Sequence, residues 1–136
     1  MKKILSKREL RKKETAAKHK EVRRIDRLHN LEIKNKYKEF VKKIKERDNR
    51  ICQICGKDLK NDAPQNCQIL HVLSQENYPQ LKCDEMNVLT SCYRCHNVAK
   101  ISSHLDGFAF VEFFKNKFPD RYEYLLNKLK EINSRI

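Results

Sequence analysis

Two short stretches decide the fold of this chain: Cys52-Gln-Ile-Cys55-Gly56 and, roughly 40 residues later, Cys92-Tyr-Arg-Cys95. A Cys-x-x-Cys pair presents two sulfurs to one ion from a single tight turn. Zinc prefers four tetrahedral ligands, and thiolates suit it. We expect Cys52, Cys55, Cys92 and Cys95 to share one zinc ion, whose binding supplies folding energy. Because four thiolates leave no open coordination position, this zinc is expected to be structural.

The glycine beside the first pair and the two cysteines outside the pairs also bear on the expected zinc site. Gly56 follows the second cysteine of its pair, where a knuckle turns backbone N–H groups toward the thiolates and a positive φ is often needed. Cys67 and Cys83 lie outside the two pairs, and the simplest interpretation of each is a buried apolar cysteine. A second metal site that uses Cys67 is the alternative.

The segment between the pairs predicts a strand, a loop and a second strand, followed by a helix. The expected ranges are 67–74, 75–86, 87–91 and 92 to about 104. His71 then lies on the first strand, Asn87 opens the second, and His96 lies on the helix that the zinc holds. Such a layout can hold a divalent cation against a general base for phosphodiester hydrolysis. Imidazole suits the base because its pKa is near neutral, and Asn87 can bond the loop that positions His71.

These residues resemble the HNH, or ββα-metal, nuclease superfamily, through Cys52–Gly56, His71, the Asn-Val-Leu-Thr-Ser of 87–91 and Cys92–Asn97. The chain is most similar to phage recombination nucleases of the NinG (Rap) type. In those proteins a CxxCG knuckle precedes a Cys-x-x-x-His segment, an Asp-Glu-x-Asn-Val stretch and a second CxxC. The counterparts here are residues 67–71, 84–88 and 92–95. The resemblance covers about residues 50–130.

The resemblance implies a metal-dependent DNA endonuclease, acting on branched or recombining DNA. His71 would be the general base, Asn87 the organising asparagine, and His96 a ligand of a catalytic Mg²⁺, Mn²⁺ or another divalent ion beside the zinc. The implied fold is α+β: a small zinc-stapled ββα-metal core flanked by N-terminal and C-terminal helices.

Two positions depart from the HNH pattern, because Leu70 and Lys100 occupy sites where many of these enzymes have metal ligands. The candidates for a replacement ligand are Asp84, Glu85 and His104. The alternative function is therefore a catalytically inactive, zinc-containing nucleic-acid-binding protein with an accessory or regulatory role.

Charge is concentrated in the first part of the chain. Residues 1–50 contain 20 lysines and arginines against 8 acidic residues, whereas residues 51–136 contain 11 against 10. Cations at this density release counterions from phosphate backbones, so a nucleic acid is the expected partner, bound with weak sequence preference. The resemblance implies that this nucleic acid is DNA. The alternative is a solvated, self-repelling tail. The expected contacts are Lys12, Lys13, Arg23, Arg24, Lys42 and Lys43.

We expect two parts: a basic helical arm over residues 1–49 and a zinc-bound domain over 50–136. Within the arm, apolar periodicity predicts a helix over 30–48, whereas residues 1–29 are weakly patterned and are expected to order with a partner.

The C-terminal part predicts two helices, the second beginning near Asp120, whose aromatic and leucine residues complete the core. A third hypothesis, a protein-binding adaptor, requires a large exposed Phe/Tyr patch on residues 108–129. The chain contains no long apolar run, and six cysteines without an export signal predict a reducing cytoplasm, bacterial or of a phage-infected cell.

Overall fold

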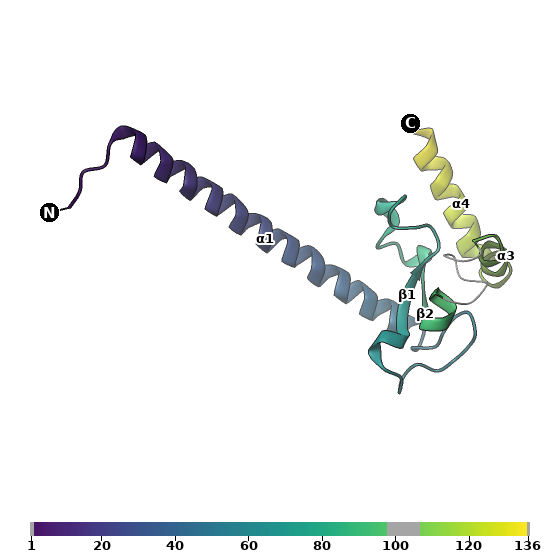
Figure 1. The fold of residues 1–136 in the computed structure, drawn as a ribbon. Coiled ribbons are helices and arrows are strands. Elements are labelled where there is room, and N and C mark those ends of the chain that lie inside the picture. The colour runs from purple at the N-terminus through teal and green to yellow at the C-terminus, as the bar shows by residue number, and fades with distance from the viewer. Residues whose placement is uncertain (1, 98–106, 136) are drawn as a thin grey trace. The chain divides into compact units, whose positions relative to one another are not determined.

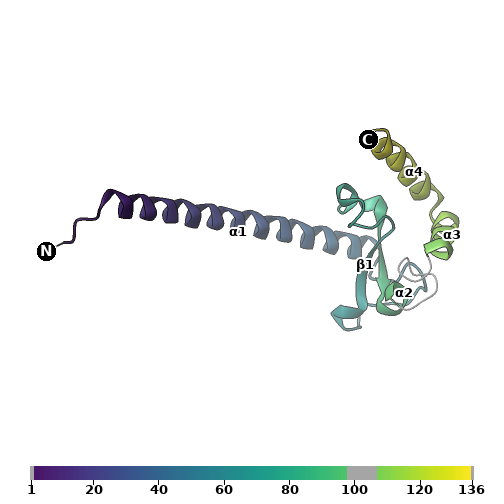
Figure 2. The same ribbon diagram turned by 45° about the horizontal axis from the view of Figure 1, so that its top comes forward.

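The computed structural model describes residues 2–97 and 107–135 and has the expected mixed α+β architecture, drawn from two directions in Figures 1 and 2. The elements are α1 (Lys7–Arg47), β1 (Cys67–His71), β2 (Val88–Cys92), α2 (Tyr93–Asn97), α3 (Gly107–Lys117) and α4 (Pro119–Ser134), with short 3-10 turns between them. The chain forms two compact units, residues 1–38 and 39–136, which are described in turn.

The first unit is helical from Lys7 onward. The helix begins with a reciprocal cap. The Ser6 hydroxyl accepts a hydrogen bond from the backbone N–H of Glu9 (3.2 Å), and the Glu9 carboxylate accepts one from the backbone N–H of Ser6 (2.8 Å). Residues 1–55 contain neither glycine nor proline, and lysine, arginine and glutamate are good helix formers. The segment 7–29, expected to be ordered only with a partner, is therefore part of a capped helix.

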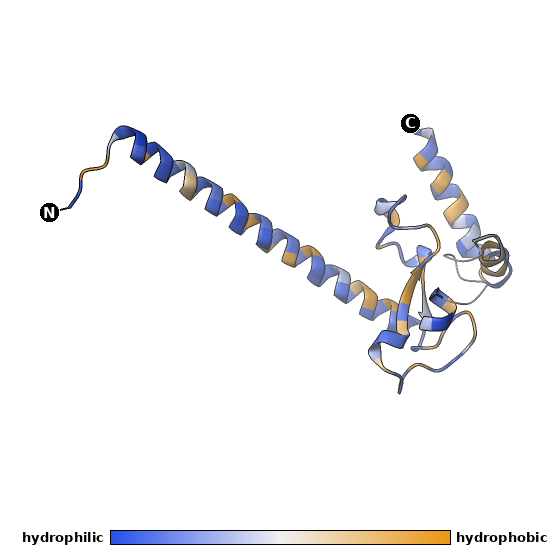
Figure 3. Ribbon diagram, viewed as in Figure 1, coloured by the Kyte–Doolittle hydropathy of each residue, from blue (hydrophilic) through white to orange (hydrophobic). Residues whose placement is uncertain are grey.

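The apolar side chains of this unit are exposed. Leu10, Val22, Ile25, Leu28 and Leu31 are each about half accessible to solvent. Figure 3 shows the corresponding isolated hydrophobic positions along a mostly hydrophilic α1. This part of α1 depends on its cap, its residue propensities and its charge pairs, and not on burial.

The second unit begins with the end of α1, close to the predicted position. Asn49 and Arg50 adopt φ values of 54° and 53°, and the Arg50 N–H donates to the Lys45 carbonyl (2.9 Å). The adjacent Asp48 is buried, and its carboxylate accepts from the Thr90 backbone N–H (2.8 Å) while pairing with Arg47 (2.9 Å). The helix end is thus attached to the free edge of β2.

β1 and β2 form an antiparallel hairpin in which Cys67 faces Cys92, Leu70 faces Leu89 and His71 faces Val88. The predicted second strand, 87–91, is observed one residue later, and the predicted first strand is shorter because β1 ends at His71. Two apolar clusters flank the hairpin. One contains four of the cysteines with Leu59, and the other contains Leu70, Leu89, Phe110, Phe114 and Leu125.

The C-terminal helices supply the second cluster, as expected. Pro119 opens α4 at its first helical position, with Phe118 as the N-cap, so the helix begins just before the predicted Asp120 and without a side-chain cap. The Tyr124 hydroxyl donates to the Asp84 carboxylate (2.8 Å), which ties α4 to the loop before β2. Phe110 and Phe114 are buried, and among the described side chains of 109–129 the exposed large hydrophobic residues are only Val111 and Leu126. The described residues therefore offer no large aromatic patch for an adaptor.

None of the helices within the described ranges has the length and apolar character needed to cross a lipid bilayer.

Candidate metal centre and histidine pocket

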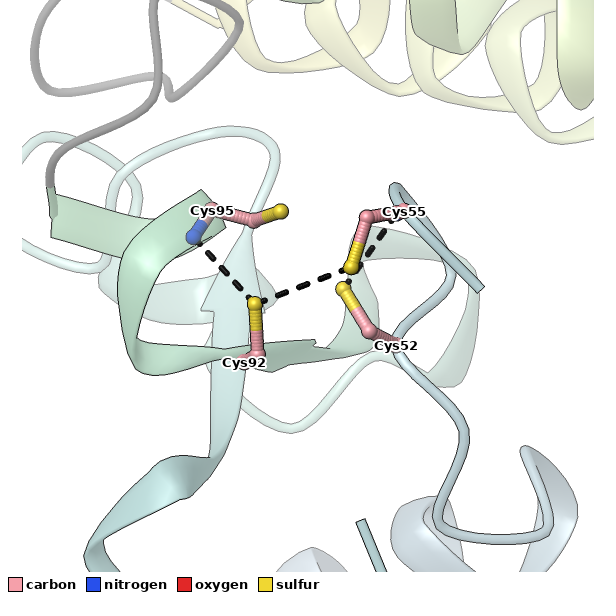
Figure 4. Close-up of side chains that lie close together, drawn as sticks. All are labelled: Cys52, Cys55, Cys92 and Cys95. Atoms are coloured by element: carbon pink, nitrogen blue, oxygen red, sulfur yellow. Dashed lines mark hydrogen bonds between the residues drawn. The ribbon is translucent and has the colours of Figure 1, made fainter. Parts of the chain in front are cut away.

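The four predicted cysteines converge. The sulfurs of Cys52, Cys55, Cys92 and Cys95 all lie within 4.8 Å of one another (Figure 4). The Cys55 and Cys92 sulfurs are 3.8 Å apart. A tetrahedron with zinc–sulfur bonds of about 2.3 Å places its sulfurs about 3.8 Å apart. The thiol geometry therefore fits a zinc ion.

Local backbone geometry brings each pair together. The Cys55 N–H donates to the Cys52 sulfur (3.5 Å), and the Cys95 N–H donates to the Cys92 sulfur (3.4 Å). Gly56 has the predicted positive φ, 79°, and its N–H donates to the Cys52 carbonyl (2.8 Å). The first turn is held against β2 by the Gln53 N–H, which donates to the Thr90 carbonyl (2.9 Å).

The thiols of the group differ in their pKa values. Burial raises the pKa of Cys52, but hydrogen bonds from the backbone of Cys55, Cys92 and Ile54 outweigh it and lower this pKa to about 7. Burial raises the pKa of both Cys55 and Cys95. Four thiolates cannot share this space without a positive charge, and a coordinated divalent ion deprotonates its thiols. A structural zinc ion would provide that charge.

The two remaining cysteines differ in environment. Cys67 is buried, as predicted, in the same apolar cluster as Cys52, Cys92 and Cys95, but it does not belong to the converging group. Cys83 is exposed, so the expectation that it is buried was wrong. It lies in a surface loop and lines a hollow with Gln80, Asp84 and Tyr124. No local pattern separates these two cysteines in the sequence, because their burial is set by packing of distant elements.

Asn87 organises the loop between the strands. Its side chain is fully buried, its Oδ1 accepts from the Leu73 N–H (2.8 Å), and its Nδ2 donates to the carbonyls of Leu73 (3.1 Å) and Leu81 (3.0 Å). The carbonyl oxygen of Lys82, the residue after Leu81, lies 3.0 Å from Nε2 of His71. The hydrogen bonds expected between Asn87 and the loop are therefore present, and they fix the segment that contacts His71.

His71 is half-buried, and the hydrogen bond defines its tautomer. A carbonyl oxygen only accepts, so Nε2 carries the proton and Nδ1 carries the lone pair. Burial lowers the pKa of His71, and this outweighs the raising effect of the Lys82 carbonyl. Burial therefore favours the neutral form of the ring.

His96 has the complementary tautomer. Its Nδ1 lies within hydrogen-bonding distance of Oε1 of Gln68, which also accepts from Nδ2 of Asn97 (3.3 Å). An accepting amide oxygen places the proton on Nδ1 of His96 and the lone pair on Nε2. Metal-binding histidines commonly have one ring nitrogen held in this way by an acceptor.

His71 and His96 line one hollow of about 480 Å³, the histidine pocket, together with Ile69, Val72, Ser74, Gln75 and Glu76. Glu76 is the acidic residue of this lining, and sequence reasoning did not select it because nothing separates it from other acids in a polar loop. Asp84 and Glu85, which were selected, line a different hollow. Asp84 accepts from Tyr124, and Glu85 pairs with Lys43 (2.5 Å).

Leu70 is fully buried and packs in the apolar cluster with Leu89, Phe110 and Phe114. Its position therefore contributes no ligand to the histidine pocket. Lys100 and His104, the other positions considered, lie outside the described residues, as does the predicted continuation of the helix to about residue 104. Among the described residues, the four thiols are the one group of three or more candidate ligand side chains whose donor atoms converge.

Comparison of the chain with known protein families, with curated proteins and with solved structures finds no match. The site is therefore interpreted from its own residues: a tetrathiolate group that suits structural zinc, beside a two-stranded hairpin.

Proposed function

We propose that this protein is a metal-dependent DNA endonuclease of the HNH type. The observation that carries the proposal is that His71, from β1, and His96, from α2, line the same pocket. The zinc cysteines Cys92 and Cys95 flank the start of α2, so the metal centre holds the helix that presents His96. The elements occur in the order strand, strand, helix, which supports the resemblance to ββα-metal nucleases.

His71 serves as the general base in this proposal. Its Nδ1 lone pair accepts a proton from a water molecule, and the resulting hydroxide attacks the phosphorus. The Lys82 carbonyl holds the opposite ring nitrogen, and Asn87 fixes the loop that supplies this carbonyl. Because burial lowers the pKa of His71, the ring is available as a base at neutral pH.

His96 and Glu76 are the side chains of the pocket that would hold a divalent cation. Imidazole nitrogen and carboxylate oxygen both bind Mn²⁺, and carboxylate oxygen suits Mg²⁺. Such an ion, when bound, offsets the charge that develops on the phosphate and on the leaving oxygen. With Leu70 in the core, Glu76 replaces the carboxylate that many HNH enzymes place directly before the base.

The substrate proposed is DNA, with branched or recombining DNA suggested by the resemblance to NinG-type nucleases. The basic arm supports a phosphate-backbone partner, because its exposed lysines and arginines contact phosphates without reading base sequence. Two of the six expected contact residues form ion pairs within the protein: Arg24 pairs with Glu21 (2.8 Å) and Lys43 pairs with Glu85 (2.5 Å).

The test is a nicking assay on linear duplex, single-stranded and four-way DNA, with Mg²⁺ or Mn²⁺. Wild type is compared with His71→Ala, His96→Ala and Glu76→Gln, and with His29→Ala, which removes an exposed histidine of the arm. We expect His71→Ala and His96→Ala to lose at least 100-fold in rate, and His29→Ala to retain activity. Equal activity of wild type and His71→Ala removes His71 from the mechanism. No activity with any DNA overturns the nuclease proposal.

The second candidate function is a zinc-containing nucleic-acid-binding protein without catalysis. The burial of Leu70 in the apolar cluster favours it, because a common ligand position of HNH enzymes is absent. This candidate predicts DNA binding with no Mn²⁺ binding at His96. A titration of zinc-loaded protein with Mn²⁺, followed by paramagnetic broadening of the His71 and His96 ring signals, separates the two functions.

A further inference from the structure

The charges on the first unit are segregated around α1. Lys20, Arg27, Lys34 and Lys38, here called the cationic face, follow one another at spacings of seven, seven and four residues. Since a helix has 3.6 residues per turn, these side chains leave the helix on one side. All four are exposed.

No acidic residue lies three or four positions before or after any cationic-face residue. Those positions are the neighbours on a helix surface. Within residues 2–97 and 107–135, no side chain of the cationic face lies at ion-pair distance from a carboxylate. The four charges of the cationic face are therefore not held in ion pairs.

The opposite side of the same helix is different. Arg11, Lys18 and Lys36 each have a glutamate three or four positions away. Lys36 forms an ion pair with Glu32 (3.2 Å). Lys18 and Lys20 are two positions apart, which turns their side chains about 200° from each other. Between Lys20 and Lys38, α1 thus has one side without acidic residues at the neighbouring positions and one side where positive and negative charges alternate.

We propose that the cationic face is the surface of the arm that lies along the phosphate backbone of duplex DNA. From Lys20 to Lys38 the helix rises about 27 Å. Over that length B-DNA presents one negative charge per roughly 1.7 Å of axis, so a straight cationic side is matched by a dense row of phosphates. The proposal rests on the DNA-binding part of the proposed function and is independent of catalysis.

A duplex fits this surface better than a single strand. Proteins that bind single strands stack bases on aromatic side chains, and the span of the cationic face, residues 20–38, contains a single Phe, Tyr or Trp residue, Tyr37 near its end. The contacts available to the cationic face are therefore contacts to phosphates, which a duplex offers at higher density.

The chain offers a matched pair of variants for the test. Lys20→Ala/Arg27→Ala/Lys34→Ala removes two lysines and one arginine from the cationic face. Arg11→Ala/Lys18→Ala/Lys36→Ala removes two lysines and one arginine from the mixed side. Because alanine is the best helix former, circular dichroism should show α1 retained in both.

Binding of zinc-loaded protein to a labelled 20-base-pair DNA duplex is measured by fluorescence anisotropy at several salt concentrations, without Mg²⁺ or Mn²⁺. We expect the cationic-face variant to lose about 100-fold in affinity and the slope of log affinity against log salt to fall by about 2.5. The mixed-side variant should lose less than about fivefold. Single-stranded DNA and duplex RNA of equal length serve as comparison probes.

Equal losses in the two variants overturn the inference while leaving DNA binding by the wild type intact. Tighter wild-type binding to single-stranded DNA or to duplex RNA, with the same dependence on the cationic face, overturns the assignment to duplex DNA. Absence of wild-type binding to every probe overturns the proposed DNA function itself, and the inference with it.

Discussion

The side-chain amide of Asn87 exchanges two hydrogen bonds with the backbone of Leu73, accepting from its N–H at 2.8 Å and donating to its carbonyl at 3.1 Å. A third bond, to the Leu81 carbonyl, ties the far end of the same loop to the same amide. After β1 has ended, the buried side chain of Asn87 thereby supplies the hydrogen bonds to the loop backbone that a paired strand would otherwise supply. The loop that it closes contains Glu76 and leads to the carbonyl that contacts His71.

Replacement of Asn87 should therefore destabilise the second unit. Asn87→Ala leaves one buried N–H and two carbonyls without their partner, and we expect the free energy of unfolding to fall by about 2–4 kcal/mol. Asn87→Asp should cost at least as much, because a carboxylate keeps the shape but faces two carbonyls. Urea unfolding of zinc-loaded protein measures both, with the exposed Asn133→Ala as the control. A loss below 1 kcal/mol for Asn87→Ala contradicts this role.

Leu70 should behave as a core residue. It is fully buried, and Leu70→Ala is expected to cost about 2–5 kcal/mol, whereas Leu126→Ala, at a position 38% exposed, should cost less than about 1 kcal/mol. Leu70→Asp introduces an acid at the position where many HNH enzymes have a ligand, but we expect it to unfold the domain rather than bind a metal. A folded Leu70→Asp protein that binds Mn²⁺ more tightly than wild type would refute the core assignment.

Removal of one zinc thiol should release the metal. Cys92 and Cys67 face each other across the hairpin and are both buried, so they form a matched pair for substitution. We expect Cys67→Ala to retain one zinc per chain and to lose about 1 kcal/mol. Cys92→Ala should lose zinc and several kcal/mol, because metal binding in such domains is folding energy. Metal analysis and thermal unfolding, with and without a chelator, give the two readouts.

If Cys67→Ala loses zinc to the same extent as Cys92→Ala, the assignment of the four ligands is wrong.

The pKa of His71 should lie below the ordinary value of 6.5, with the proton of the neutral ring on Nε2. Nitrogen-15 NMR of the imidazole rings across pH 5.5–8 measures both, and His71→Gln assigns the signal. A lowered pKa means that the folded state binds fewer protons than the unfolded state as pH falls below about 6.5. Protonation then favours unfolding, so stability present at pH 7 is lost toward pH 5.5.

The loss of stability on acidification should be smaller in His71→Gln than in wild type, with zinc content checked at each pH. A pKa of His71 at or above 6.5 contradicts the effect of burial.

The positions of the hairpin and of the cysteine group were predictable because both depend on local chemistry. A CxxC turn presents two sulfurs to one ion whatever its position in the chain. The alternation of apolar and polar residues around His71 and the apolar run after Asn87 identify the two strands to within a few residues. The helix over residues 7–29 could also have been predicted from the sequence, because Ser6 and Glu9 have the spacing of a reciprocal cap. The weak hydrophobic periodicity of residues 7–29 did not indicate this helix, because this part of α1 buries no side chain.

The sequence by itself determined the four cysteines that converge, the α+β class and the charge imbalance between the two parts of the chain. These follow from residue type and spacing along the chain. Only the tertiary structure decided that Glu76 shares a pocket with both histidines, that Leu70 lies in the core, that Cys83 is exposed and that Asp48 caps the free edge of β2. Each of these depends on which distant segments pack together, and packing is a property of the folded chain that no local pattern records.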